Sequence, residues 1–206
     1  KKWRIGYYEG GDYSNYYKYL VGTIKGLMDL GWIDSKELPK ILNEKTDILW
    51  YWLSKNAKSK YIQFVLDGYY TARWDKAQRK ELSKKIINRL RTKKDIDLMI
   101  AMGTWAGKDL ANERHHTPTM VLSTSDPVGS GIIKSVEDSG YDHVHAQTDP
   151  YRYERQLRVF HDMIGFKKVG ICYEDTDSGR SYAAVDKVEK VAKERGFEIV
   201  KAYTKS

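Results

Sequence analysis

Short runs of β-branched and aromatic residues alternate with segments of helical periodicity along the whole chain. Such runs are typical of strands that are buried on both faces, and their alternation with helices favours a parallel sheet. We therefore predict an α/β fold with a doubly wound parallel sheet and helices on both of its faces. The seven predicted strands are 3–8, 61–66, 96–102, 119–124, 143–147, 168–173 and 197–202.

The segments between these runs predict the helices. Apolar residues recur at helical spacing over 16–30, and Gly31 follows as a C-terminal cap. Residues 75–91 place an apolar stripe on one face and Lys and Arg on the other, which we interpret as a solvated face rather than a phosphate site. Two further helices are predicted over 151–164 and 181–195.

The predicted elements divide into two units. Residues 1–148 contain five strands and form a first α/β unit, with a helical insertion near 34–60 that opens around Ser35. A strand ends at Thr148, and Asp149 and Pro150 then favour the start of a new helix. Residues 149–206 are therefore predicted to begin a second α/β unit.

The composition narrows the class of protein. Of the 206 residues, 41% are hydrophobic and 31% are charged, and no apolar run approaches the about 18 residues that a membrane-spanning helix needs. The formal net charge is +8, but basic and acidic residues are interspersed, so nucleic acid is not indicated as a partner. The single cysteine, Cys172, forms no internal disulfide, and we expect it to lie in a buried strand as a small hydrophobic residue.

The predicted strand ends are rich in functional groups. In an open α/β sheet, ligands collect beyond the carboxyl ends of the strands. Hydroxyls, carboxylates and aromatic rings occupy the segments at five of these ends, namely 7–14, 67–74, 103–106, 123–127 and 174–179. These residue types are also common in turns and caps, but as a set they favour a cleft for a small polar or aromatic molecule.

Other kinds of site find less support in the sequence. His143 and His145 share one face of a predicted strand, but no third ligand stands at metal spacing, so we predict no metal site. His115 and His116 follow a helix, where exposure or charge balancing is expected. The glycine-rich nucleotide motifs and the Gly-x-Ser-x-Gly nucleophile motif do not occur, so we expect no cofactor and no catalytic residue.

The segment PTMVLSTSDPV at 118–128 resembles a known family. Together with Ile5-Gly6 in the first strand, GTWA at 103–106 and KVGICY at 168–173, it is similar to substrate-binding proteins of ABC transporters. The resemblance is to the family with tryptophan-binding members, and it implies the type I periplasmic-binding-protein fold. Residues 139–144 depart from the Gly-Gly-Asn-Val-Thr-Gly-like passage of that family, so the resemblance does not extend to the linker and its ligand contacts.

The resemblance implies capture of a small, amino-acid-like solute between two closing lobes and its delivery to a membrane permease. The ammonium group of such a solute needs acceptors, its carboxylate needs donors, and an apolar side chain needs rings. Thr104 lies in the matching GTWA element, and Pro127 is expected to start a helix after Asp126. The acceptors expected on this reasoning are Glu9, Asp126 and Asp175, the donors are Ser123, Thr124 and Ser178, and the rings are Tyr8, Tyr13, Trp74 and Trp105.

Two complete lobes of this kind need about 280 to 300 residues, so the second lobe is expected to be incomplete within these 206. We expect residues 151–206 either to continue into further chain or to pair with another copy in a homodimer. The resemblance also implies an exported protein, periplasmic or extracellular, free or held at the membrane as a lipoprotein, whose leader lies outside this sequence.

Two alternatives remain open at this point. The first is an enzyme on a doubly wound sheet, with Glu9, Asp126 or Asp175 as its acid or base. The second is the effector-sensing domain of a transcription regulator, which shares the fold alone.

Overall fold

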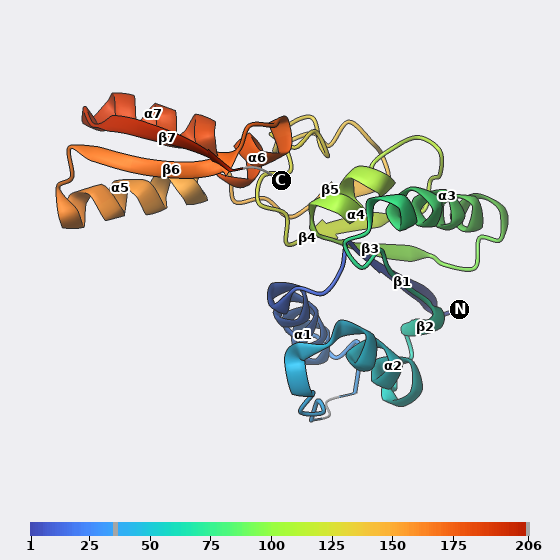
Figure 1. Ribbon diagram of the computed structural model, residues 1–206. Coiled ribbons are helices and arrows are strands. Elements are labelled where there is room, and N and C mark those ends of the chain that lie inside the picture. The colour runs from blue at the N-terminus through green and yellow to red at the C-terminus, as the bar shows by residue number, and fades with distance from the viewer. Residues whose placement is uncertain (35–36, 205–206) are drawn as a thin grey trace.

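The computed structural model describes residues 1–34 and 37–204. A parallel sheet of five strands has the order β2-β1-β3-β4-β5, and a second sheet pairs β6 with β7, also in parallel (Figure 1). The fold is thus the α/β doubly wound parallel sheet that the hydrophobic pattern predicts. The strands are β1 (Trp3–Glu9), β2 (Ile62–Thr71), β3 (Leu98–Met102), β4 (Thr119–Leu122), β5 (Val144–Ala146), β6 (Lys168–Glu174) and β7 (Glu198–Thr204).

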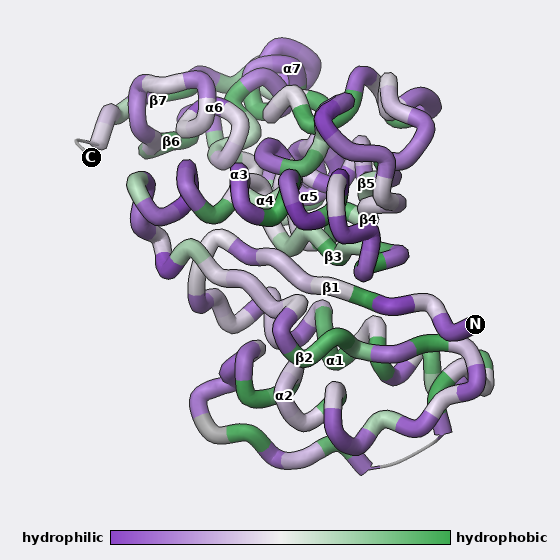
Figure 2. The backbone as a smooth tube through the Cα atoms, turned by 90° about the vertical axis from the view of Figure 1, so that its right-hand side faces the viewer, coloured by the Kyte–Doolittle hydropathy of each residue, from purple (hydrophilic) through white to green (hydrophobic). Residues whose placement is uncertain are grey.

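Helices cover both faces of the five-stranded sheet. Figure 2 shows α1 and α2 on one side of β1, with α3, α4 and the two-stranded sheet on the other. Among residues 1–34 and 37–204, no helix is both long enough and apolar enough to cross a lipid bilayer. The helices are α1 (Ser14–Asp29), the short 3-10 helix η1 (Leu42–Glu44), α2 (Thr46–Asn56), α3 (Lys76–Thr92), α4 (Gly103–Leu110), α5 (Arg152–Ile164), α6 (Asp177–Tyr182) and α7 (Val185–Arg195).

The inner strand β1, between β2 and β3, contributes side chains to both hydrophobic cores of the five-stranded sheet. Successive side chains of a strand point to opposite faces, so Tyr7 enters the core with α1 and α2 while Tyr8 enters the core with α3 and α4. Both rings are fully buried. A strand covered by helices on both faces therefore keeps even its polar residues away from solvent.

Strand β2 is longer than predicted. Residues 67–71, expected as part of a loop, continue the strand, and its pairing with β1 shifts register between Ile5 and Tyr7. Ile5 pairs with Phe64, whereas Tyr7 pairs with Tyr69, so residues 65–68 form a bulge. The register shift lets β2 continue past the point at which its apolar run ends.

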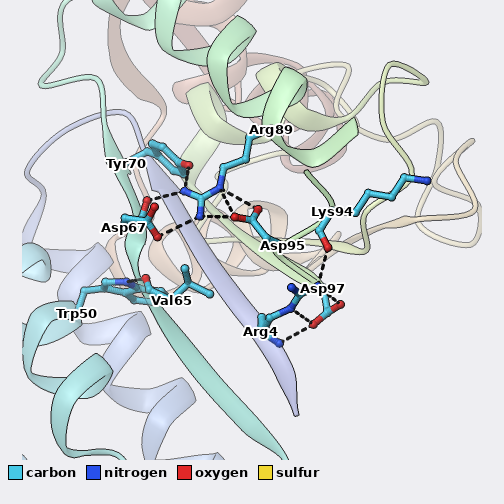
Figure 3. A network of polar contacts seen from close by, with 9 residues as sticks. All are labelled: Arg4, Trp50, Val65, Asp67, Tyr70, Arg89, Lys94, Asp95 and Asp97. Carbon is cyan, nitrogen blue, oxygen red and sulfur yellow. Dashed lines mark hydrogen bonds and ion pairs between the residues drawn. The ribbon is translucent and has the colours of Figure 1, made fainter. Parts of the chain in front are cut away.

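Side chains from two helices bind the carbonyls of this bulge. The Trp50 indole donates to the Val65 carbonyl at 2.9 Å, and the Arg89 guanidinium donates to the Asp67 carbonyl at 2.7 Å (Figure 3). Arg89 also donates to both carboxylate oxygens of Asp95, at 2.9 to 3.2 Å. Carbonyls at a bulge lie outside the regular ladder, and these two are satisfied by long-range contacts.

The structure corrects two helix predictions and bears on a third in part. The insertion near 34–60 contains the helix α2, which begins at Thr46, while the expected helix start at Ser35 lies outside the described residues. The expected helix at Pro127 is wrong, since residues 127–131 form hydrogen-bonded turns. The segment 181–195 divides into the end of α6 and all of α7, because Ala184 between them is left-handed with φ 50°.

The two-stranded sheet is covered on one face. Burial alternates along β6, and α5 and α7 contribute to a small core around Val191 and Phe197. Cys172 lies on the uncovered face and is exposed, so the prediction that it is buried is wrong. Met163 of α5 is also exposed, at 76% of its surface. Burying the exposed face of this sheet would need further chain or a second copy of the protein. The expected continuation or pairing of residues 151–206 therefore stays a prediction.

Candidate functional site

Four aromatic rings gather at the carboxyl edge of the five-stranded sheet. Tyr13 and Tyr16 stand edge to face with ring centroids 5.1 Å apart, and Tyr16 lies 6.2 Å from Trp74. Trp74 in turn meets Trp105 edge to face at 5.4 Å. These four residues, from the ends of β1, β2 and β3 and the start of α1, are called the aromatic rim below.

Two glycines allow Trp74 to lie against the chain after β1. A Cβ added to Gly10 would lie 2.7 Å from the Trp74 ring, and one added to Gly11 would lie 2.6 Å from it. The Trp74 indole donates to the Asp12 carbonyl at 3.0 Å, and its backbone N–H donates to the Gly10 carbonyl at 2.8 Å. The ring is fixed in place although it is 46% exposed.

Trp105 is held from the opposite side by α3. The Arg79 guanidinium lies over its ring at 4.6 Å from the centroid, a cation–π distance, and also bonds the Asp109 carboxylate at 2.8 to 3.1 Å. Asp109 accepts a further bond from the Tyr8 hydroxyl at 2.7 Å. Tyr8 was expected at the cleft, but it occupies the core because its face of β1 is covered by α3 and α4.

The amino end of α4 faces the same edge. Gly103 has φ +84°, and a Cβ there would overlap the Tyr16 hydroxyl, so only glycine fits between the helix and the rim. Thr104, expected at the site, is the second residue of α4 and is 8% exposed. Met102 precedes the helix and makes no side-chain cap, which leaves amides of the first turn available to an anion.

Glu9 is placed beneath the edge and not on its surface. The side chain is fully buried, and its carboxylate accepts bonds from the hydroxyls of Tyr7 at 2.8 Å, Thr46 at 2.9 Å and Tyr69 at 2.9 Å. Burial raises the pKa of the Glu9 carboxyl, and the three hydroxyl bonds offset that effect only in part. Glu9 was expected to meet an ammonium group, but here its partners come from the protein itself.

Residues after β4 bring polar groups to the edge. Ser123 is left-handed, with φ 55°, and turns the chain out of the strand. The Thr124 hydroxyl is buried without a hydrogen-bond partner among the described residues. The Asp126 carboxylate accepts a bond from the Gly129 amide at 2.8 Å, so it stabilises the turns that stand where a helix was expected.

A cleft of about 320 Å³ lies between the two sheets. Lys108 of α4 and Asp126 of the loop after β4 line it from one side, and Asp177, Arg180 and Ser181 line it from α6. The Ser181 hydroxyl is buried and has no partner among residues 1–34 and 37–204. Polar groups that follow strands of both sheets in the chain therefore converge here.

The predicted site residues of the second unit stand at the end of β6. Asp175 is exposed in the turn between β6 and α6, and Ser178 lies in α6, beside the residues that line the cleft. The Thr176 hydroxyl accepts a bond from the Gly179 amide at 3.0 Å and so caps α6. This cap fixes where α6 begins next to the cleft.

The structure thus separates the predicted residues into groups. It brings Tyr13, Trp74 and Trp105 together in the aromatic rim, and Thr104 and Thr124 lie near the same strand ends. Sequence reasoning placed Tyr16 on the apolar stripe of a helix and so missed its part in the rim. Tyr16 lies in the first turn of the helix that follows a strand-end loop, and this position could have indicated that its ring lies at the sheet edge.

Comparisons with known proteins agree with this architecture. A family model described as ABC transporter substrate binding protein matches residues 58–206. A curated tyrosine-binding protein of Clostridioides difficile (strain R20291) is 28% identical over 105 residues, which cover 50% of this chain and 30% of that protein.

Solved structures share the fold at low sequence identity. An ABC domain of Streptococcus pneumonia in complex with L-Trp has a TM-score of 0.68 and 16% identity, and the match covers 99% of this chain and 58% of the other. A ligand-free, open substrate-binding protein with adhesive properties from Clostridium difficile has a TM-score of 0.59 and 19% identity, covering 98% and 58%. The chain spans less than two thirds of the length of these relatives. With more than half of its residues matched by the family model, the chain belongs to the ABC transporter substrate-binding protein family.

Proposed function

We propose that this protein binds an amino acid with an aromatic side chain between its two sheets and delivers it to the membrane permease of an ABC importer. The aromatic rim is the observation that carries the proposal. The centroids of its neighbouring rings are 5.1 to 6.2 Å apart, and the rings lie at the sheet edge where ligands of such folds collect. The printed names of two relatives, one tyrosine-binding and one in complex with L-Trp, support the same ligand class.

The polar end of the ligand meets groups next to the rim. The amides at the start of α4 bind the carboxylate, together with the hydroxyls of Ser123 and Thr124. The Asp126 carboxylate, which borders the cleft, accepts from the ammonium group. From the second sheet, Asp175 and Ser178 add an acceptor and a donor.

Residues 1–148 and 149–206 act as two lobes in this proposal. Closure of the second lobe over the rim buries the ligand and presents the closed form to the permease, outside the cytoplasmic membrane. No bond in the ligand is made or broken. The family match supports this receptor over the enzyme and over the effector-sensing domain, because the family is one of solute-binding proteins.

Indole resonances provide the test. We expect L-tyrosine and L-tryptophan to shift the Nε1–H signals of Trp74 and Trp105 in nuclear magnetic resonance spectra, which register even millimolar binding. The Trp32 signal stays in place, because Trp32 packs against Tyr61 at 5.8 Å, away from the rim. L-Leucine is expected to bind more weakly, since it cannot form the aromatic contacts.

Two matched variants separate a binding role from a general loss of structure. Trp74 and Trp32 are 46% and 45% exposed, so Trp74→Ala and Trp32→Ala remove similar rings from similar environments. We expect Trp74→Ala to weaken binding about tenfold, the loss of one or two aromatic contacts of about 0.5 to 1.5 kcal/mol each. Equal affinities of the two variants would contradict the proposal.

A further inference from the structure

We propose that Glu113, His116 and His143 bind a divalent transition-metal ion, Zn²⁺ by their ligand chemistry, at the amino edge of the five-stranded sheet. One ligand atom from each side chain lies within 4.8 Å of those of the other two. Glu113 and His116 stand in the loop between α4 and β4, and His143 directly precedes β5. The three residues lie at the edge opposite the aromatic rim, so this site is separate from the amino-acid site.

Pairing of β4 and β5 brings the two segments together. Parallel neighbours place their amino ends side by side, and the Thr119 amide donates to the His143 carbonyl at 2.7 Å across that end. The rings of His116 and His143 have centroids 5.6 Å apart. The sequence shows no such relation, because 26 positions separate these histidines and the spacing matches no metal motif.

His143 supplies a second, independent observation. Its Nε2 atom is buried and has no hydrogen-bond partner among the residues that the structure describes. A buried ring nitrogen without a partner is unfavourable, and coordination of a cation by the neutral imidazole removes that penalty. An ion pair between Glu113 and His116, whose nearest atoms are 4.0 Å apart, would leave this nitrogen unexplained.

The neighbouring His115 positions the ligands without joining them. It is buried, its Nε2 donates to the Leu110 carbonyl at 3.0 Å, and its Nδ1 accepts from the Thr117 amide at 3.3 Å. Both of its ring nitrogens are therefore occupied. Its ring stands edge to face against His143 at 5.0 Å, which fixes the orientation of the deeper ligand.

The geometry suits zinc after a small contraction. Bonds of about 2.0 to 2.2 Å in a tetrahedron place ligand atoms about 3.3 Å apart, so atoms now within 4.8 Å must approach by at most about 1.5 Å. The side chains of Glu113 and His116 are 67% and 80% exposed and can rotate by this amount. The nearby Arg114 guanidinium bonds the Asn112 side-chain oxygen at 2.9 Å and is not a ligand. Water completes the four ligands of a His₂Glu set.

Metal titration of the 206-residue chain, prepared without a histidine tag and freed of metal by a chelator, tests the proposal. We expect one equivalent of Zn²⁺ to bind, as measured by competition with a chromophoric chelator. Co²⁺ is expected to give the intense visible absorption of tetrahedral coordination. Glu113→Gln and His116→Gln, both at exposed side chains, should weaken Zn²⁺ binding at least about tenfold while the fold is retained.

His145→Gln is the matched control. His145 is an exposed histidine of β5, two positions from His143 and outside the cluster, so its replacement should leave Zn²⁺ affinity unchanged. Zn²⁺ binding that survives both cluster variants, or that falls equally in the control, would overturn the proposal. So would a Co²⁺ spectrum of weak octahedral bands. The titration contains no amino acid, so its result does not depend on the proposed function.

Discussion

Gly11→Ala is the sharpest perturbation of the aromatic rim. A Cβ at this position would lie 2.6 Å from Cδ1 and 2.7 Å from Nε1 of Trp74, whereas carbon atoms in ordinary contact are about 3.5 to 4.0 Å apart. The indole must therefore move by about 1 Å. Because Trp74 is 46% exposed, we expect it to swing outward and not to strain the backbone.

The cost of that movement follows from the contacts that it breaks. The bond from the Trp74 indole to the Asp12 carbonyl contributes about 0.5 to 1.5 kcal/mol, and the edge-to-face contact with Trp105 contributes a similar amount. Replacing glycine by alanine returns about 0.4 to 1 kcal/mol by restricting the unfolded chain. Taking the middle of each range, the predicted net loss in the free energy of unfolding is about 1 kcal/mol.

Urea unfolding followed by far-ultraviolet circular dichroism measures this loss, and the near-ultraviolet spectrum reports the displaced indole. Gly22→Ala is the control, since a Cβ there meets no described atom within 4 Å and the residue lies inside α1. That variant should gain up to about 1 kcal/mol from helix propensity. A Gly11→Ala protein with wild-type stability and an unchanged near-ultraviolet spectrum would refute the placement of Trp74.

Two further predictions concern pH. Burial raises the pKa of the Glu9 carboxyl, so the wild-type protein loses stability as pH rises through that pKa. Glu9→Gln has no such group, so its free energy of unfolding in urea, relative to that of the wild type, should increase from pH 4 to pH 7. A difference in free energy of unfolding that decreases over this interval would contradict the prediction. The Arg4 guanidinium, bonded to Asp97 at 2.8 Å, holds the pKa of that carboxyl well below its usual range. The ion pair therefore stabilises the protein above about pH 4, and this stabilisation is lost below that pH. The free energy of unfolding that Asp97→Asn loses relative to the wild type should decrease as pH falls from 6 to 3. A loss that stays constant over this range would contradict the prediction.

The order of elements could be predicted because local pattern and burial agree there. The apolar runs at 3–8 and 96–102 become β1 and β3, most of whose residues are buried by helices on both faces, and the predicted bounds differ by at most two residues. The bulge in β2 could not be predicted. It depends on Trp50 and Arg89, which reach the Val65 and Asp67 carbonyls from helices distant in sequence.

The bounds of short helices could not be predicted from the sequence either. α4 has eight residues and begins at Gly103, whose φ of +84° is outside the helical range, so neither propensity nor a capping residue marks its start. Nothing in the sequence marks the break at Ala184 either, because alanine is a strong helix former, yet this residue is left-handed with φ 50°. At both positions the backbone conformation could not be derived from residue propensity alone.

The sequence predicted that the candidate site lies at the carboxyl edge of the sheet, but not which residues form it. A list of residues that follow strands treats all of them as surface, yet Tyr8 and Glu9 belong to the inner strand β1 and are buried whichever face they take. The rim residues lie one turn farther along, where the chain has left the sheet. Glu9 still acts on this edge, since its carboxylate binds the hydroxyls of Tyr69 in β2 and Thr46 in α2.

The contacts behind the rim determine what ligand binding must still order. Trp74 is held by the chain after β1, and Trp105 is held by Arg79 from α3, so the two indoles are fixed from opposite sides of the sheet edge. Side chains that are already in place lose little conformational freedom when a ligand arrives. The entropic cost of binding therefore falls mainly on the ligand and on closure of the second lobe, and substitutions behind the rim, such as Gly11→Ala, should weaken binding without touching the ligand.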